Sequence, residues 1–435
     1  DVNRIYAVDQ VSVISIVGQD LSSFHKPYNA LINNQIVPLL FNNTVTGKNV
    51  SMVLLKKDLN KALNVMHAQI FGQAKKVNIV VVGVGQVGGA LVDQILKTAP
   101  QIEERKGIKL QIFALVNSKK MLLDAKGIGK ATKDWRADLA NSTTLLDFEA
   151  LFLFAQEQHL ENLLLVDNTA SSTFVQHYEG FVRHGYDLVS SNKIANTLPF
   201  TQYKALRKTL REYQKQYLYE TNVGAGLPLI DTIKLLHLSG ENITQIRGVF
   251  SGSLSYIFNT FSTTDLPFSQ VVQEALEKGY TEPDPREDLS GNDVGRKLLI
   301  LARELDLKNE FSEGVIENLI PEALQGLDAP GFLAQMSKLD PIFAKIKAGL
   351  APDEVLRYMG VLGGDLQKDK GQLSAGLSKV PKQSPLGQVK GADSIIEIYT
   401  ESYGNRPIVI QGAGAGATVT ARGVFGDILR IVEKN

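Results

Sequence analysis

The chain has 435 residues, a length typical of roughly two to four domains, and its 44% hydrophobic and 21% charged residues are the balance of a soluble globular protein. No apolar run approaches the ~18 residues of a membrane helix, and the 46 basic residues equal the 46 acidic ones, so neither a membrane nor a nucleic acid is an expected partner. The lack of cysteine excludes disulfides, Cys-ligated metals and thiol catalysis, and it fits the reducing cytoplasm.

Residues 1–74 predict a small module of strands and helices. We expect strands at 11–18, 36–41 and 49–57 and helices at 21–34 and 58–71, the second capped by Asp58. The order βαββα is one strand short of a ferredoxin-like ACT domain, the amino-acid-sensing module of biosynthetic enzymes, and the segment before Val11 is a candidate for the missing edge strand. A docking subdomain without a ligand explains the order equally well. Because the chain starts at Asp1 without an initiator Met or a signal segment, we expect it to be a piece of a longer protein.

Residues 75–214 show strands alternating with helices. The expected strands lie at 77–83, 109–116 and 162–169, and the expected helices at 88–99 and 147–158. The first strand is almost continuously apolar, as in a parallel sheet that is buried on both faces. This pattern predicts an α/β fold with a Rossmann-type domain. The pattern is mixed over 215–405, and a strand at 407–412 and a last helix follow within 406–435.

A glycine turn follows the first of these strands. Gly83, Gly85 and Gly88 form G-x-G-x-x-G, with Gln86 and Val87 at the expected helix start. Gly83 permits the tight turn, Gly85 lets a pyrophosphate approach the backbone, and Gly88 lets the helix pack closely on the strand. The helix N-terminus offers N–H groups to the phosphates, so we expect a dinucleotide site rather than a bare turn.

The end of the next strand bears on which dinucleotide binds. An Asp or Glu usually stands there to bind the ribose hydroxyls of NAD, whereas this chain has Asn117 and Ser118 followed by Lys119 and Lys120. A carboxylate would repel a 2′-phosphate, and lysines attract one. We therefore expect a preference for NADP(H), with NAD(H) as an alternative cofactor and two merely solvated lysines as the alternative interpretation.

Several later stretches closely resemble homoserine dehydrogenases. They lie at 192–193, 219–228, 251–256, 279–289 and 291–297. With the ACT-like module upstream, the chain is most similar to the C-terminal part of a bifunctional aspartokinase–homoserine dehydrogenase. The resemblance implies NAD(P)-dependent interconversion of aspartate 4-semialdehyde and homoserine, towards threonine and methionine. It also implies a missing aspartokinase region before Asp1, a homodimer or higher homo-oligomer, a catalytic and dimerisation domain over 215–405, and a segment 406–435 that returns to the Rossmann domain.

Two charged residues are candidates for the proton transfer that aldehyde reduction needs. Asp293 and Lys297 are spaced i and i+4 on an expected helix that starts near Ser290, so they share a face. An ammonium at Lys297 would polarise the aldehyde and supply the proton while Asp293 orients it. An exposed ion pair worth only ~0.2–0.5 kcal/mol is the alternative that spacing alone favours, and the resemblance favours catalysis.

Three further residues are expected to contact substrate. Glu282 and Asp288 belong to an acidic, proline-containing loop that provides a counter-charge for a substrate ammonium group, unless Arg286 neutralises it. The resemblance assigns substrate binding to Glu282 and a second contact to Asp288. It also places Lys193 near both substrate and nicotinamide, although Ile194 stands where the family often has a second lysine.

The resemblance implies a monovalent-cation site and further cofactor contacts. Sodium is expected at the carboxylate of Glu220 and the carbonyl oxygens of Val223, Ala225 and Leu227, since a hard cation prefers oxygen ligands. A glycine-permitted bend before a helix is the alternative. Thr169, which ends the strand at 162–169, and Gly416 are expected beside the cofactor.

Two rival functions stay open from the sequence. One is a dehydrogenase acting on another amino-acid semialdehyde with the same cofactor turn. The other is a catalytically silent fragment that senses an amino acid through the ACT-like module and oligomerises the parent enzyme. The joint presence of a lysine–carboxylate pair, an acidic loop and a cofactor turn favours catalysis over the silent fragment.

Overall fold

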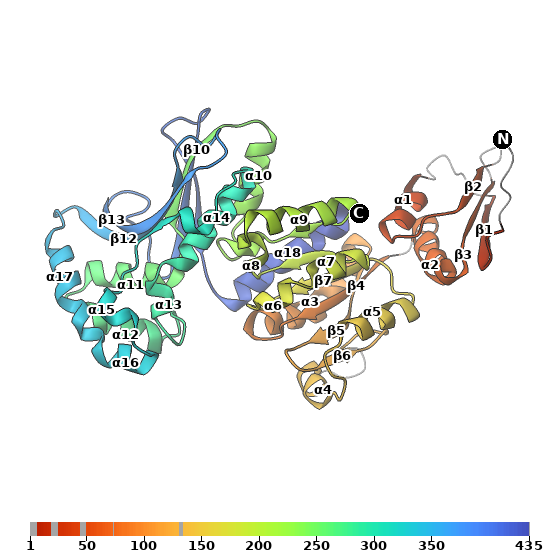
Figure 1. Ribbon diagram of the computed structural model, residues 1–435, viewed down its shortest axis with the longest axis horizontal. Helices are drawn as coiled ribbons and strands as arrows, with labels where there is room; N and C mark the ends of the chain where they lie inside the picture. Colours follow the sequence, from red (N-terminus) through yellow and green to blue (C-terminus); the bar gives the residue numbers. More distant parts are fainter. Residues whose placement is uncertain (1–6, 19–24, 44–48, 73, 130–133, 435) are drawn as a thin grey trace. The chain divides into compact units, whose positions relative to one another are not determined.

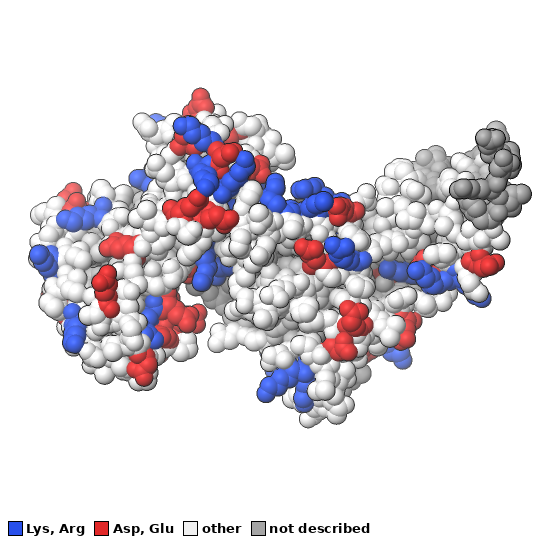
Figure 2. Space-filling view, in the orientation of Figure 1, with Lys and Arg blue, Asp and Glu red and all other residues white. Residues whose placement is uncertain are grey.

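The computed structural model describes residues 7–18, 25–43, 49–72, 74–129 and 134–434 (Figure 1). The chain forms two compact units. Unit 1 comprises Asp1–Ser190, Leu206–Leu218 and Phe425–Asn435, and unit 2 comprises Ser191–Ala205 and Tyr219–Val424. On the face drawn in Figure 2, acidic and basic side chains are interspersed. Within the described ranges, no helix has the length and apolar character needed to cross a bilayer.

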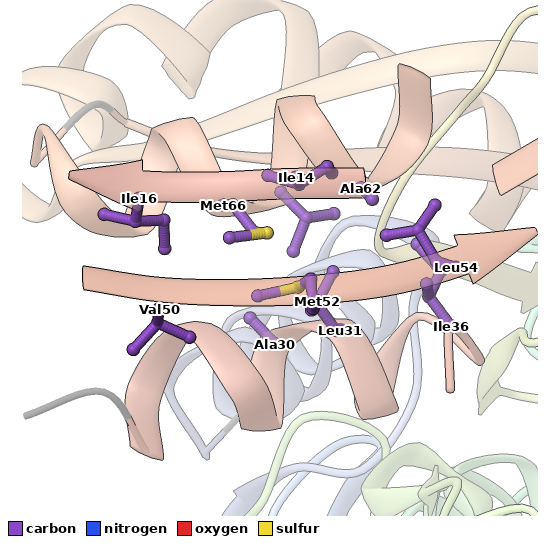
Figure 3. Packing of buried hydrophobic residues seen from close by; sticks show 11 residues of the cluster. Ile14, Ile16, Ala30, Leu31, Ile36, Val50, Met52, Leu54, Ala62 and Met66 are labelled. Carbon is purple, nitrogen blue, oxygen red and sulfur yellow. The ribbon is translucent and has the colours of Figure 1, made fainter. Parts of the chain in front are cut away.

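The N-terminal module of unit 1 has the predicted order βαββα. Its elements are β1 (Val11–Val17), α1 (His25–Asn33), β2 (Leu40–Asn43), β3 (Asn49–Leu55), the 3₁₀ turn η1 (Lys56–Asp58) and α2 (Leu59–Ile70). The antiparallel sheet has the order β1-β3-β2. Alternate residues of the strands, such as Ile14 and Met52, point toward Leu31 and Met66 of the helices and form a closed core (Figure 3).

Some details of this module differ from the prediction. The strand expected at 36–41 begins only at Leu40. Pro38 has no N–H group to donate to a neighbouring strand. The first backbone hydrogen bond to β3 is therefore made by the N–H of Leu39, which donates to the carbonyl of Val53 at 2.7 Å. Asp58 directly precedes α2, but its side chain makes no capping hydrogen bond. Most of the segment proposed as the missing edge strand lies outside the described residues.

The remainder of unit 1 is a Rossmann-like layer of parallel strands with helices. The sheet order is β6-β5-β4-β7-β8-β9, and only β6 runs antiparallel to its neighbour. The strands are β4 (Lys75–Val82), β5 (Ile108–Val116), β6 (Met121–Leu123), β7 (Leu163–Asp167), β8 (Asp187–Ser190) and β9 (Tyr217–Leu218). The helices are α3 (Gln86–Lys106), α4 (Trp135–Asn141), α5 (Phe148–Glu157), α6 (Ser172–Val175) and α7 (Tyr178–Arg183). The three predicted strands are confirmed, whereas α3 continues through Pro100 and ends where Gly107 adopts φ +63°.

Unit 2 is built on a second six-stranded sheet of order β11-β13-β12-β10-β14-β15. Its strands are β10 (Ile243–Val249), β11 (Val315–Ile316), β12 (Glu354–Gly363), β13 (Gln372–Pro381), β14 (Asp393–Thr400) and β15 (Ile408–Ala413). The longer helices are α10 (Leu229–Leu238), α11 (Gly252–Thr263), α12 (Phe268–Glu277), α14 (Asn292–Glu304) and α17 (Asp340–Ala348). The short helices and 3₁₀ turns are α8 (Ile194–Thr197), η2 (Glu220–Asn222), α13 (Arg286–Leu289), η3 (Phe311–Glu313), α15 (Glu322–Gln325), α16 (Ala329–Gln335) and η4 (Met336–Leu339).

One glycine lets a helix lie close to this sheet. A Cβ at Gly360 of β12 would lie only 2.8 Å from the Phe250 ring and 2.9 Å from a Val294 methyl group. Any larger residue there would displace the Phe250 ring and the Val294 side chain of α14. Gly360 therefore helps to place the first two turns of α14, which carry Asp293 and Lys297.

The compact units divide the chain differently from the predicted domain boundaries. Residues 191–205 belong to unit 2 rather than to the Rossmann-like unit. Within 406–435, β15 pairs with β14 in the sheet of unit 2, and only Phe425–Asn435 belongs to unit 1. The helices α9 (Phe200–Glu212) and α18 (Ala417–Lys434) each contribute residues to both units.

Candidate active site

The turn between β4 and α3 has the geometry that a dinucleotide needs. Gly83 has φ +81°, and a Cβ there would lie 2.7 Å from the methyl group of Thr169. A Cβ at Gly88 would collide with the carbonyl oxygen of Gly83. Apart from the residues next to Gly85 in the chain, no atom of the described residues lies within 4 Å of its Cβ position, so its backbone stays open to a ligand. Gln86 and Val87 begin α3.

A cavity of about 550 Å³ opens beside this turn, entirely within unit 1. Its lining includes five of the predicted cofactor residues, namely Gly83, Gly85, Asn117, Ser118 and Thr169. Phe148, Phe174 and His177 add aromatic surface to the same cavity. The glycine turn, the helix start and the partly apolar wall suit the phosphates and rings of a nicotinamide dinucleotide.

Asn117 forms a side-chain turn at the end of β5. Its Oδ1 accepts hydrogen bonds from the backbone N–H groups of Lys119 at 2.9 Å and Lys120 at 2.8 Å. The ammonium of Lys120 donates to the carbonyl of Ala140 at 3.0 Å, whereas Lys119 is exposed. Lys119 is therefore the better candidate for a contact with a 2′-phosphate.

The cofactor turn gives a direct prediction. Gly85→Ala is expected to leave thermal stability nearly unchanged, because in the described part of the chain the added methyl group meets only the residues next to it in sequence. It should weaken NADPH binding about tenfold or more, since the methyl occupies the approach of the pyrophosphate. NADPH titration followed by cofactor fluorescence measures the effect.

Gly180→Ala is the matched control, because Gly180 lies in α7 of the same unit and its Cβ position is also open. Equal NADPH affinity in the two variants would contradict the placement of the pyrophosphate.

In unit 2, one carboxylate bridges two ammonium groups. Lys297 Nζ lies 2.8 Å from Asp293 Oδ2, one turn along α14, and Lys193 Nζ lies 3.3 Å from Asp293 Oδ1. Lys297 also donates to the main-chain carbonyl of Phe250 at 2.6 Å. The shared helix face of Asp293 and Lys297 is confirmed, and Lys193, which directly precedes α8, joins them from a distant part of the sequence.

Exposure and charge distinguish the members of this cluster. The Lys297 side chain is 9% exposed, whereas that of Asp293 is 42% exposed and that of Lys193 33%. Burial lowers the pKa of the Lys297 ammonium, although the Asp293 carboxylate opposes this shift. Loss of hydration alone would raise the pKa of Asp293, but the two lysines outweigh it and hold that pKa well below its usual value. The cluster therefore combines an ionised carboxylate with a buried ammonium that releases its proton more readily than an exposed lysine.

The acidic loop lies within electrostatic range of the same cluster. Asp288 Oδ2 accepts from the backbone N–H of Glu282 at 2.9 Å, and its Oδ1 accepts from Ser253 Oγ at 2.6 Å. Loss of hydration and the neighbouring Asp288 raise the pKa of Glu282, while Lys193 opposes the shift. Burial likewise raises the pKa of Asp288, and the hydrogen bond from Ser253 lowers it by a smaller amount. All five predicted catalytic and substrate residues of unit 2 are thus brought together.

Arg286 does not pair with either of the two predicted substrate acids. Its Nε donates to Asp284 Oδ1 at 2.9 Å, in a fork that Nη2 completes on Oδ2 of the same carboxylate. The loop therefore neutralises Asp284 internally. Neither Glu282 nor Asp288 is paired with this guanidinium.

Sequence reasoning missed two contributors to this site. Ser253 holds Asp288, yet the stretch 251–256 suggested only a resemblance and no role. The Phe250 carbonyl that receives Lys297 is a main-chain atom, so no residue type indicates it. The packing of α11 beside α13 reveals the role of Ser253, and the contact of Lys297 with the residue between β10 and α11 reveals that of the Phe250 carbonyl.

The turn after Glu220 is an ordered helix entry. The buried Glu220 carboxylate accepts from the backbone N–H groups of Ile230 at 2.7 Å and Asp231 at 3.0 Å, at the start of α10. Ala225 has φ +52°, and Val223 and Leu227 lie in the same bend. One carboxylate and nearby main-chain carbonyls are the donor types that suit a hard cation, and sodium there stays a prediction. Gly416, with φ +121°, belongs to unit 2, and its contact with the cofactor also stays a prediction.

Models of known protein families match residues in both units. A family model described as homoserine dehydrogenase matches residues 228–429, and one described as homoserine dehydrogenase, NAD binding domain, matches residues 83–220. The homoserine dehydrogenase of Saccharomyces cerevisiae is 37% identical over 375 residues, which cover 83% of this chain and 99% of the yeast protein. The chain belongs to the homoserine dehydrogenase family.

Homoserine dehydrogenases are NAD(P)-dependent oxidoreductases. Two further proteins are similar to the chain over most of its length. The bifunctional aspartokinase/homoserine dehydrogenase of Haemophilus influenzae is 35% identical over 435 residues, which cover 99% of this chain and 52% of that protein. The chain thus spans about half the length of the bifunctional relatives. A crystal structure of a Candida auris protein of unknown function superimposes with a TM-score of 0.73 at 33% identity, over 83% of this chain and 99% of that one.

Proposed function

We propose that this chain catalyses the NAD(P)H-dependent reduction of L-aspartate 4-semialdehyde to L-homoserine. The observation that carries the proposal is the Asp293 carboxylate held between the ammonium groups of Lys193 and Lys297, beside the acids Glu282 and Asp288. A bound nicotinamide supplies the hydride to the aldehyde carbon. The protein must then supply the proton to the aldehyde oxygen and hold the substrate in place.

Lys297 is the proposed proton donor. Its buried ammonium polarises the aldehyde oxygen as charge develops there and then transfers its proton. The lowered pKa of Lys297 favours this transfer, while Asp293 and the Phe250 carbonyl fix the direction of the ammonium. In the reverse direction the neutral amine accepts the proton from the homoserine hydroxyl.

Glu282 and Asp288 are the proposed partners of the substrate's α-ammonium group. Asp288 is held at both oxygens, by Ser253 and by the backbone of Glu282, so little ordering entropy is lost on binding. Lys193 is the proposed contact near the substrate and the nicotinamide. Its charge complements the substrate carboxylate.

A comparison of substrates tests the proposed function. Aspartate 4-semialdehyde should be reduced with a far higher kcat/KM than butanal, which offers the same aldehyde without an ammonium or carboxylate group. A homologous semialdehyde with one more methylene should fall between them, because its charged groups cannot all reach their partners. Equal kcat/KM for the three aldehydes would exclude the proposed ammonium site.

The cofactor preference gives a second prediction for the Rossmann-like unit. The unmodified chain is expected to prefer NADPH over NADH, and this preference should weaken as salt rises, since exposed Lys119 is screened. Asn117→Asp should shift the ratio of kcat/KM values towards NADH, because an anion then faces the 2′-phosphate and can accept from ribose hydroxyls. The side-chain turn should survive, since aspartate accepts the same two N–H bonds.

Lys119→Gln should reduce the NADPH preference, and Lys120→Gln, whose parent ammonium donates to Ala140, is its control. A preference for NADH at low salt would show that the adenosine ribose of the cofactor does not lie beside Asn117 and Lys119.

Further proposals concern a bound ion, the N-terminal module, the assembly of the chain and its location. A sodium ion at Glu220, Val223, Ala225 and Leu227 would stabilise the entry to α10 rather than take part in hydride transfer. We further propose an ACT fold for residues 1–74, a homodimer or higher homo-oligomer, an aspartokinase region in the parent chain, and a cytoplasmic location. The βαββα order of the module supports the ACT fold. The greater length of the bifunctional relatives supports the aspartokinase region.

A further inference from the structure

Unit 2 contains a groove that shares no residue with the proposed active site. It has a volume of about 760 Å³ and lies where the end of α11 and the start of β12 meet the loop between β13 and β14. Its lining residues from α11 and the turn after it are Asn259, Thr260, Thr263 and Thr264. The other side includes Arg357 of β12 and Lys382, Gln388 and Lys390 of the loop.

The groove is strongly cationic. Arg357, Lys382 and Lys390 all line it, and none of the described residues that line it is an aspartate or a glutamate. Lys347 adds a fourth positive charge nearby, where it donates to the carbonyl of Thr264 at the end of α11. Three positive side chains with no lining carboxylate favour a negatively charged ligand.

Arg357 is unusual because it is almost completely buried, at 2% exposure, and its hydrogen-bond partners are all carbonyls. It donates to Leu386 at 3.0 Å, to Gly387 at 2.6 Å and to Leu356 at 2.7 Å. Carbonyl groups solvate the guanidinium but leave its positive charge uncompensated. The same bonds fix the loop that carries Lys382 and Lys390, so the groove is formed before any ligand binds.

An unpartnered acceptor points to a second feature of the ligand. The amide nitrogen of Asn259 donates to the carbonyl of Gly391 at 2.9 Å and to Ser255 Oγ at 3.2 Å, which fixes the orientation of the amide. Its Oδ1 is buried and has no hydrogen-bond partner among the residues that the structure describes. A buried acceptor needs a donor, so the ligand should carry a hydroxyl group.

We propose that this groove binds a small hydroxylated organic anion. Its anionic group lies between Lys382 and Lys390 in the field of Arg357, and a hydroxyl group of the same molecule donates to Asn259 Oδ1. The threonine hydroxyls of α11 offer further hydrogen bonds. This is a binding site separate from the dehydrogenase chemistry.

Isothermal titration of the 435-residue chain with sn-glycerol 3-phosphate and with inorganic phosphate tests the proposal. NADP⁺ is present at saturation to occupy the cofactor cavity. Glycerol 3-phosphate is expected to bind about tenfold more tightly than phosphate, since only glycerol 3-phosphate carries an alcohol hydroxyl that can reach Asn259 while its phosphate group stays between the lysines. Asn259→Ala should remove this advantage and leave phosphate binding unchanged.

The paired variant Lys382→Gln/Lys390→Gln should weaken both probes about tenfold or more while dehydrogenase turnover stays unchanged. Lys338→Gln/Lys345→Gln, which removes two exposed lysines elsewhere in unit 2, controls for net charge and should bind both probes normally. The proposal is overturned if neither probe binds, or if the two paired variants bind equally. Equal affinity of the unmodified chain for the two probes would overturn the role of Asn259, even if the Asn259→Ala variant does not fold.

Discussion

Lys297→Ala is expected to lower turnover about 10²-fold or more while leaving NADPH binding nearly unchanged, the size of effect that follows the loss of a positioned proton donor. The Lys297 side chain is buried and directed by Asp293 and the Phe250 carbonyl. The Lys193 ammonium lies on the other oxygen of Asp293, is more exposed and lacks the contact with the Phe250 carbonyl. Asp293 keeps its ion pair with Lys193 in this variant, which limits the cost of an unpaired carboxylate. Steady-state kinetics and NADPH titration separate the two effects.

Asp293→Ala should lower turnover to a similar degree, because the ammonium loses its orientation and its counter-charge. The matched control is Lys208→Ala in α9, which breaks an i,i+4 ion pair with Glu212. In that pair the Lys208 side chain is 73% exposed and the Glu212 side chain 52%. That variant should behave like the unmodified chain. If Lys297→Ala kept comparable turnover, the Asp293–Lys297 pair would be an ordinary structural ion pair.

Glu282→Gln is expected to raise KM for aspartate 4-semialdehyde about 10- to 150-fold with a smaller change in kcat, since a charge-assisted contact to the ammonium group is worth ~1.5–3 kcal/mol. The backbone N–H that holds Asp288 is retained, and the exposed side chain is not needed for packing. Glu287→Gln, an exposed acid in the same loop, is the control and should leave KM almost unchanged.

The pH dependence of KM offers a second measure of the same contact. Loss of hydration and the charge of Asp288 raise the pKa of Glu282. As pH falls through this raised value, Glu282 is neutralised, so KM of the unmodified chain should rise at a higher pH than for an ordinary glutamate. Glu282→Gln should lack this rise. An unchanged KM in the variant would remove Glu282 from the substrate site.

Local patterns predicted the parts of the fold that depend on neighbouring residues. Apolar runs placed β4, β5 and β7, and the glycine spacing placed the turn before α3, because strand burial and φ > 0 are short-range requirements. The i,i+4 spacing of Asp293 and Lys297 predicted a shared helix face for the same reason.

Long-range contacts were beyond that reasoning. The ion pair between Lys193 and Asp293 joins residues a hundred positions apart, and the bond from Ser253 to Asp288 depends on how α11 packs beside α13. The extent of an edge strand depends in the same way on the strand beside it. Pairing with β3 determines that β2 starts at Leu40, and pairing with β14 brings β15 into unit 2. Burial of Lys297 also follows from packing, so its lowered pKa could not be predicted from spacing.

On the proposed mechanism, this chain itself carries out the hydride and proton transfer. The most direct test follows NADPH absorbance after addition of L-aspartate 4-semialdehyde to the 435-residue chain, with homoserine measured as the product. We expect NADPH to be consumed only when the semialdehyde is present, in equal amount to the homoserine formed. Binding of NADPH without its oxidation would contradict the account and favour a catalytically silent regulatory fragment.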